Sequence, residues 1–157
     1  MRKGTYVLVG LQTKVAEGQP TPLRPGFLCL VTAHEMHDLR QWLVKGQLPA
    51  DLENKLQWLE SRGMMHQFIA QNCRLFFTLL NAVYTGMFKE MGAHERDEML
   101  RVLAYVRKDE DAIPDYTSGG FTDDLQEVRA AILQMQSLLN RFKAWRLCHQ
   151  VPHMWRN

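Results

Sequence analysis

Carboxylates gathered between residues 109 and 124 are the side chains with the clearest chemical potential. That segment reads Asp109-Glu-Asp-Ala-Ile-Pro-Asp-Tyr-Thr-Ser-Gly-Gly-Phe-Thr-Asp-Asp124. Carboxylate oxygens are the ligands that Mg²⁺ and Ca²⁺ prefer, so Asp111, Asp115 and Asp124 are the candidate cation ligands. The segment is not an EF-hand loop, because Pro114 stands where that loop requires glycine. A metal-dependent enzyme that uses residues 109–124 is therefore one alternative, and turn-forming or helix-capping carboxylates are the other. No further cofactor is predicted.

The second segment with distinctive chemistry is the C-terminus, residues 140–157, which is basic and contains no acidic residue. Its cations and rings are the candidate partner-binding residues: Arg141, Lys143, Trp145, Arg146, His149, His153, Trp155 and Arg156. Cations hold phosphates by charge while aromatic rings stack on bases, which favours nucleic-acid binding. Equally, the cations can face an anionic protein partner or complement a helix dipole, with the tryptophans anchoring the helix to the protein body.

Recognisable catalytic motifs are scarce. His34 and His37 are three residues apart, whereas the zinc protease motif places its histidines four apart on one helix face. Histidines at the solvent edge of an amphipathic helix explain them more simply. The glycine pair Gly119-Gly120 follows a helical pattern rather than the strand that precedes a phosphate-binding loop. The sequence therefore favours a protein without catalytic activity.

Residues of the acidic segment also have structural roles. Pro114 lacks an amide hydrogen and cannot continue a helix, so the preceding helix must end before it. The glycine pair can adopt positive φ angles in the turn that follows. Thr122 or Asp123 can then cap the next helix, and Asp124 in its first turn complements the positive end of the helix dipole.

The same segment resembles the central motif of the YkvA-like domain of unknown function. The residues that carry the resemblance are Tyr105, Ile113, Pro114, Asp115, Thr117, Gly119, Gly120, Asp123 and Asp124. They form a D-x-I-P-D turn followed by G-x-x-D-D and a helix, over about residues 95–135. The chain departs from the family where Gln126, Glu127 and Arg129 interrupt the apolar stretch, which favours a soluble variant. The resemblance implies a helix-loop-helix at about residues 95–149, and because the family has no settled activity it implies no particular function.

Helical patterns cover the chain from Thr32 onward. Thr32 and Glu35 fit a capping box, and Gly46 supplies a stop. A second helix over residues 49–63 should pair with the first as an antiparallel hairpin. Three further helices are expected, over residues 64–89, 94–107 and 124–149. The first of these three is apolar on nearly all sides, as a central hub helix must be.

Residues 1–31 differ from the helical domain, which comprises residues 32–157. Two β-favouring runs, Tyr6–Val9 and Phe27–Val31, flank a polar stretch that contains three prolines. This pattern predicts a short N-terminal β-hairpin or an extended arm. The expected fold class is mainly α: a compact bundle of about five helices with that hairpin or arm.

Length and composition fit one soluble domain. The chain has 157 residues, of which 46% are hydrophobic and 23% charged, values typical of globular proteins. Residues 64–88 are long enough to span a bilayer, but Arg74 would cost about 2.5–3.5 kcal/mol at its centre, which favours a buried helix. Three separated cysteines argue against a disulfide framework, and the N-terminal apolar run is too short for a signal peptide. We therefore expect a cytoplasmic protein without a transmembrane segment.

These features predict a non-catalytic helical interaction module, an accessory subunit or adaptor. It would dock on a protein partner through the N-terminal arm and the basic, aromatic C-terminal tail. A nucleic-acid-binding protein that uses the basic tail is the first alternative, and a metal-dependent enzyme that uses the acidic segment is the second. The oligomeric state stays open.

Overall fold

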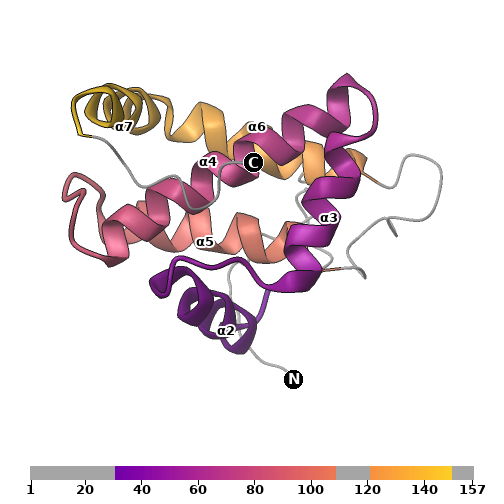
Figure 1. The fold of residues 1–157 in the computed structure, drawn as a ribbon, viewed down its shortest axis with the longest axis horizontal. Helices are drawn as coiled ribbons and strands as arrows, with labels where there is room; N and C mark the ends of the chain where they lie inside the picture. Colours follow the sequence, from indigo (N-terminus) through magenta and orange to yellow (C-terminus); the bar gives the residue numbers. More distant parts are fainter. Residues whose placement is uncertain (1–30, 109–120, 150–157) are drawn as a thin grey trace, which may run out of the picture.

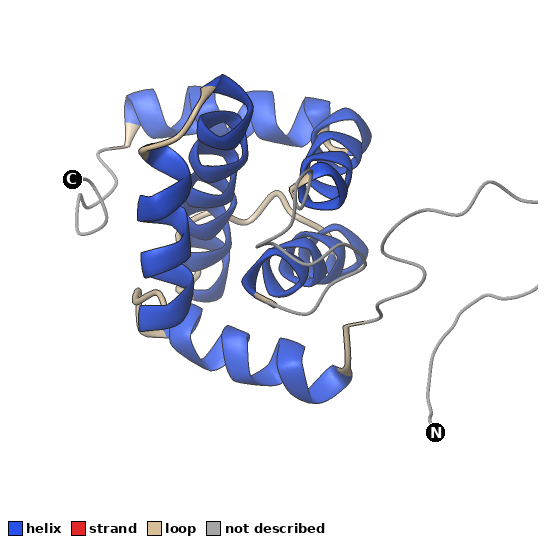
Figure 2. Ribbon diagram, turned by 90° about the vertical axis from the view of Figure 1, so that its right-hand side faces the viewer, coloured by secondary structure: helices blue, strands red, loops and turns tan. Residues whose placement is uncertain are grey.

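The computed structural model describes residues 31–108 and 121–149, and every element within them is an α-helix (Figures 1 and 2). The helices are α2 (Ala33–Val44), α3 (Ala50–Glu60), α4 (Met64–Tyr84), α5 (Ala93–Arg107), α6 (Thr122–Gln134) and α7 (Gln136–Cys148). The mainly α fold class is thereby confirmed for the described residues. The predicted N-terminal hairpin or arm, residues 1–31, lies outside them except for Val31.

Local start and stop signals act as predicted at α2. Thr32 donates its backbone N–H to Glu35 Oε1 at 2.8 Å, and the Glu35 N–H donates to Thr32 Oγ1 at 3.1 Å. The predicted capping box is therefore confirmed. The helix ends at Val44, and Gly46 follows with a φ of 75°, a left-handed conformation that favours glycine.

Helix α4 is the hub, as its apolar pattern predicts. It packs against α2, α3, α5 and α6. Its buried residues are Ile69, Ala70, Cys73, Phe76, Phe77, Thr78, Leu79, Leu80 and Ala82. In Figure 1 it runs through the middle of the molecule with the other helices around it. Among the described residues, none of the helices combines the length and the apolar character needed to cross a membrane.

Helices α2 and α3 do not pair as the predicted antiparallel hairpin. Helix α2 packs on α4 and α5, whereas α3 packs mainly on α4. Asn81 of α4 donates its side-chain amide to the Leu43 carbonyl at 2.7 Å, which ties the end of α2 to the hub. The prediction was wrong because α4 is apolar on nearly every side and offers both helices more apolar surface than they offer each other.

The predicted single helix over residues 124–149 is also wrong, because it is divided at Met135 into α6 and α7. Met135 has φ −116° and ψ 26°, outside α-helical geometry. The break redirects α7 so that Phe142 meets Phe88, from the loop between α4 and α5, with ring centres 5.2 Å apart. Burial of Phe142 offsets the cost of interrupting the helix. The described residues therefore contain six helices rather than about five.

Candidate functional site

The aspartate pair that opens α6 is turned into the protein. Asp123 and Asp124 are both fully buried, although they lie in the first turn of the helix. Asp123 Oδ2 accepts a hydrogen bond from the Tyr105 hydroxyl of α5 at 2.7 Å. The N-cap residue is Phe121 rather than the predicted Thr122 or Asp123, so α6 begins earlier than predicted, and Phe121 makes no side-chain capping hydrogen bond. The carboxylate of Asp123 contacts α5, and the acidic first turn still complements the helix dipole.

Lys55 of α3 supplies the positive charge beside Asp124. Its ammonium nitrogen Nζ lies 3.5 Å from Asp124 Oδ2, and it also donates to the backbone carbonyls of Val106 and, at 3.3 Å, Lys108. Those carbonyls belong to the C-terminal end of α5, where the helix dipole is negative. One cation therefore joins the end of α5 and the start of α6 to α3.

A further buried carboxylate, Glu127, lies on the next turn of α6. Its Oε1 accepts a hydrogen bond from Arg101 Nη2 at 2.8 Å, and the same nitrogen lies 2.7 Å from Glu98 Oε2. Burial alone would lower the pKa of Arg101, but the two carboxylates outweigh it and the pKa is raised. The guanidinium stays charged and fixes α5 to α6. Sequence reasoning missed the pairs Lys55–Asp124 and Arg101–Glu127, because the partners in each pair lie in different helices and no local pattern links them.

Cys73 of α4 lies in the same interior region. The residue is fully buried, and this burial raises the pKa of its thiol far above the ordinary range. The negative charge of Asp124 raises that pKa further. The thiol is therefore protonated at neutral pH. In that form it is a poor nucleophile, because only the thiolate is an effective one.

The acidic segment offers no complete cation site within the described residues. Across residues 31–108 and 121–149, no group of three or more His, Cys, Asp or Glu side chains is arranged to hold a metal ion. A cation at Asp124 would have to compete with the ammonium group of Lys55. The remaining predicted motif and metal residues lie outside the described ranges: Asp111, Ile113, Pro114, Asp115, Gly119 and Gly120.

Trp145 anchors α7 to the protein body. Its ring stacks on Phe142, one turn earlier, with centres 5.7 Å apart and planes at 20°. It also stacks on His149, one turn later, at 4.7 Å and 16°. These two neighbours lie on opposite sides of Trp145 along the helix. Phe88 meets the ring edge-on at 5.4 Å. Trp145 and His149, both predicted to bind a partner, are thus engaged in packing.

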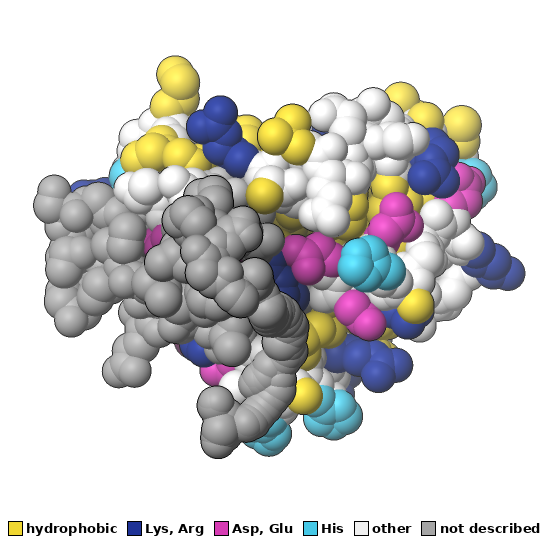
Figure 3. Space-filling model, turned by 180° about the vertical axis from the view of Figure 1, so that it is seen from behind, with side chains coloured by type: hydrophobic (Ala, Val, Ile, Leu, Met, Phe, Trp, Pro, Cys, Tyr) yellow, Lys and Arg dark blue, Asp and Glu magenta, His cyan; other side chains and the backbone are white. Residues whose placement is uncertain are grey.

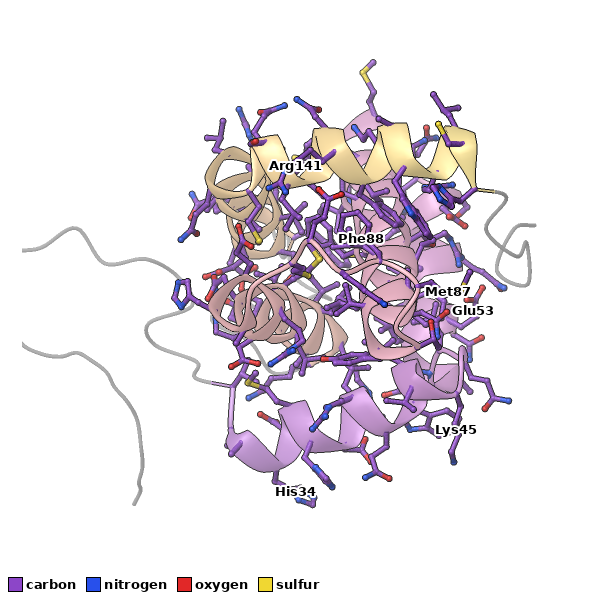
Figure 4. The ribbon with its side chains drawn as sticks, turned by 90° about the vertical axis from the view of Figure 1, so that its left-hand side faces the viewer. His34, Lys45, Glu53, Met87, Phe88 and Arg141 are labelled. Atoms are coloured by element: carbon purple, nitrogen blue, oxygen red, sulfur yellow. The ribbon has the colours of Figure 1, made fainter. Side chains whose placement is uncertain are left out.

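The cations of α7 lie toward solvent. Arg141 pairs with Glu90 of the loop between α4 and α5, Nη1 to Oε1 3.1 Å, and Figure 4 shows Arg141 on the loop side of the helix. Arg146 lies over the Phe142 ring at 5.7 Å. Lys143 is exposed, and α7 contains no acidic residue. Arg141 is therefore partly neutralised within the protein, whereas Lys143 and Arg146 face outward without an acidic partner among the described residues.

The outward face of α7 combines these charges with an apolar side chain. Leu147 is 88% exposed and lies one turn after Lys143. Figure 3 shows the end of the molecule that α7 occupies at its upper right, where hydrophobic, basic, acidic and histidine side chains lie together. The predicted binding residues His153, Trp155 and Arg156 lie outside the described residues.

No family model, curated protein or solved structure matches this chain. The resemblance to the YkvA-like domain therefore stays a prediction.

Proposed function

We propose that this protein is a non-catalytic helical interaction module, an accessory subunit or adaptor, that docks on a partner protein through α7. The observation that carries the proposal is the outward face of α7, where Lys143 and Arg146 stand near the exposed Leu147. Cations beside an apolar contact select a partner by charge while the apolar side chain is buried in the interface. The partner that complements this face presents an acidic surface with an apolar contact point.

The buried polar groups support a structural rather than a catalytic role. Lys55, Asp123 and Asp124 are engaged between α3, α5 and α6. The carboxylates of Asp123 and Asp124 are fully buried and are therefore not open to a substrate in this structure. The thiol of Cys73 is held in its unreactive, protonated form. The buried polar contacts are thus explained by a structural role, which is to hold α3, α5 and α6 together.

A nucleic-acid-binding role is the second candidate, favoured by the cations of α7. Base stacking on Trp145 would have to compete with the rings of Phe142 and His149, which already stack on it. Phosphate contacts by Lys143 and Arg146 would remain. Fluorescence anisotropy with single- and double-stranded oligonucleotides at two salt concentrations tests this candidate, because phosphate contacts weaken steeply with salt. Absence of binding at low salt excludes it.

The interaction proposal is tested by the mass of the native assembly. The tagged protein is isolated gently from its own host and passed through size exclusion with light scattering. A particle heavier than the 18.3 kDa monomer that contains a second protein is the expected result. A lone monomer that recovers no partner counts against the proposal.

A further inference from the structure

Helix α7 is the described helix that is least surrounded by other helices. Each of α2 to α6 packs on at least two other helices, whereas α7 packs mainly on its neighbour α6. Beyond α6 it contacts the loop between α4 and α5, where Phe88 meets the rings of Phe142 and Trp145 with centres 5.2 and 5.4 Å apart. Arg141 pairs with Glu90 of the same loop at 3.1 Å. Figure 4 shows Phe88 and Arg141 close together beneath α7.

The bend between α6 and α7 is made at a single residue, Met135. Its N–H donates to the Ala131 carbonyl at 2.9 Å, and its carbonyl accepts from the Leu139 N–H at 2.9 Å. Both bonds have the four-residue spacing of an α-helix. Helical hydrogen bonding therefore reaches the bend from both sides. Figure 1 shows α6 lengthwise and α7 nearly end-on, so a rotation at one residue redirects the whole of α7.

The local sequence favours a continuous helix across this bend. Sharp bends are usually found at proline or glycine, and residues 122–148 contain neither. Gln134 and Gln136, on either side of Met135, are exposed and are good helix formers. Helix α7 begins without a side-chain cap, and in a continuous helix its first amide groups would donate to carbonyls of α6. The bend is therefore stabilised by the tertiary contacts of α7 rather than by its own sequence.

The apolar stripe of the two helices suits the continuous form as well as the bent one. Its buried members keep helical spacing through the bend: Val128, Ala131, Met135, Leu138, Leu139 and Phe142. In a continuous helix the second half of this stripe would extend beyond the protein body and be exposed. That exposure disfavours a straightened monomer. A second copy removes the cost, because its own α7, once straightened, leaves the matching contact surface uncovered.

We propose that two copies of this chain form a dimer by exchanging α7, with α6 and α7 joined as one continuous helix in each copy. The α7 of one copy would take, on the other copy, the position that its own α7 occupies in the structure. The Phe88–Phe142 contact and the Glu90–Arg141 pair would then form between copies. Monomer and dimer make the same contacts, so the balance between them is set by the backbone at Met135 and by protein concentration.

A second copy is the occupant that fits this position best. A helix from another protein would need the same apolar spacing and a cation opposite Glu90, and a second copy has both because its sequence is identical. The inference is independent of the function proposed above, because α7 keeps Lys143 and Arg146 on its outward face in either form. A dimer that contains only this chain would support the exchange and would not bear on docking to another protein.

The exposed Glu90–Arg141 pair allows the exchange to be detected without altering the core. Glu90→Arg and Arg141→Glu each place like charges opposite each other in the monomer. In an α7-exchanged heterodimer of the two variants, both contacts become opposite-charge pairs. Equal amounts, one isotopically labelled, are unfolded in urea and refolded together at up to about 1 mM, where docking between copies competes with docking within one. Native mass spectrometry should show the heterodimer in excess of the homodimers by at least about tenfold, since two repulsive contacts become attractive.

A second mixture controls for attraction between oppositely charged proteins. Glu90→Arg mixed with Arg129→Glu has the same net charges, but Arg129 lies on α6 outside the exchanged contact. This mixture should give heterodimer and homodimers in statistical proportion. The double variant Glu90→Arg, Arg141→Glu restores the pair within each copy, and its dimer fraction should equal that of the wild type.

Lengthening the connection tests the role of the bend. Insertion of Gly-Ser-Gly-Ser after Met135 lets α7 fold back on its own copy without a one-residue bend, which raises its effective concentration there. The insertion variant should therefore be monomeric under conditions in which the wild type dimerises. Its α7 amides should remain protected from hydrogen exchange, because the contacts of α7 are kept.

Three results would overturn the proposal. One is a wild-type protein that stays monomeric at every concentration up to about 1 mM after refolding. Another is a heterodimer of Glu90→Arg and Arg141→Glu no more abundant than in the control mixture, which would assign the dimer to a different surface. The third is dimerisation of the insertion variant to the same extent as the wild type.

Discussion

Replacing Lys55 by methionine removes the cation that lies between the end of α5 and the start of α6. Methionine keeps the length and apolar stem of lysine, so the change is mainly one of charge. The buried Asp124 would lose the ammonium group 3.5 Å away, and the carbonyls of Val106 and Lys108 would lose a donor. An ionised carboxylate left in the interior without its cation destabilises the folded state.

The expected cost follows from the burial and the distance. Removing one partner of a buried ion pair costs about 3–5 kcal/mol. The side chain of Lys55 keeps 10% exposure and the contact is longer than an ideal pair, so we expect the lower end, about 3 kcal/mol. For a domain of this size, that corresponds to a fall in Tm of about 6–12 °C.

Urea unfolding followed by circular dichroism measures this loss. The double variant Lys55→Met, Asp124→Asn replaces the carboxylate by an uncharged group of the same shape and should recover at least half of the lost stability. Lys89→Met, in the exposed loop before α5, is the control and should change stability by less than about 0.5 kcal/mol. A loss below about 1 kcal/mol for Lys55→Met, or no recovery in the double variant, would refute the reasoning.

Three further predictions concern other parts of the fold. Trp145→Ala should destabilise the protein by about 2–3 kcal/mol, which is less than for a fully buried tryptophan because this ring is only partly buried. The loss of its packing should also increase amide hydrogen exchange in α7, and protection equal to that of the wild type would contradict this prediction. The Arg74 hydrogen bond lowers the pKa of Glu53, so its stabilisation is complete above about pH 4.3 and is lost as pH falls through the lower folded-state value. The stability difference between wild type and Glu53→Gln should therefore shrink in acid, and a difference independent of pH would argue against this linkage. Cys73 should resist alkylation until the protein unfolds while the exposed Cys148 reacts at once, as peptide mapping by mass spectrometry would show.

Much of the helical fold could be predicted because its signals are local. The capping box of Thr32 and Glu35 and the stop at Gly46 each involve residues within one turn, and both are formed. The apolar pattern of α4 likewise identified the hub. The break at Met135 carries no proline or glycine, and the apolar periodicity continues through it. The break accompanies the contact of Phe142 with Phe88, and no local pattern encodes a contact between residues so far apart in the sequence.

The sequence identified the polar residues of the interior by type, but it predicted neither their burial nor their partners. The pair Asp123-Asp124 was recognisable as the start of a helix, but its burial depends on Lys55 and Tyr105, which belong to other helices. The same limit applies to the exposed apolar side chains of Trp58, Met64, Met65 and Phe68, where α3 meets α4. Helical periodicity indicates which residues share a face, and it does not indicate that no other helix covers that face.

The claim that α7 is a protein-binding surface is tested most directly by charge reversal. The proteins retained by the immobilised wild type would be quantified against those retained by Lys143→Glu, Arg146→Glu. The control is Lys89→Glu, Arg129→Glu, which reverses the same number of exposed charges outside α7. We predict that one or more acidic proteins are retained by the wild type and the control and lost from the α7 variant. Equal retention by all three proteins would contradict the account.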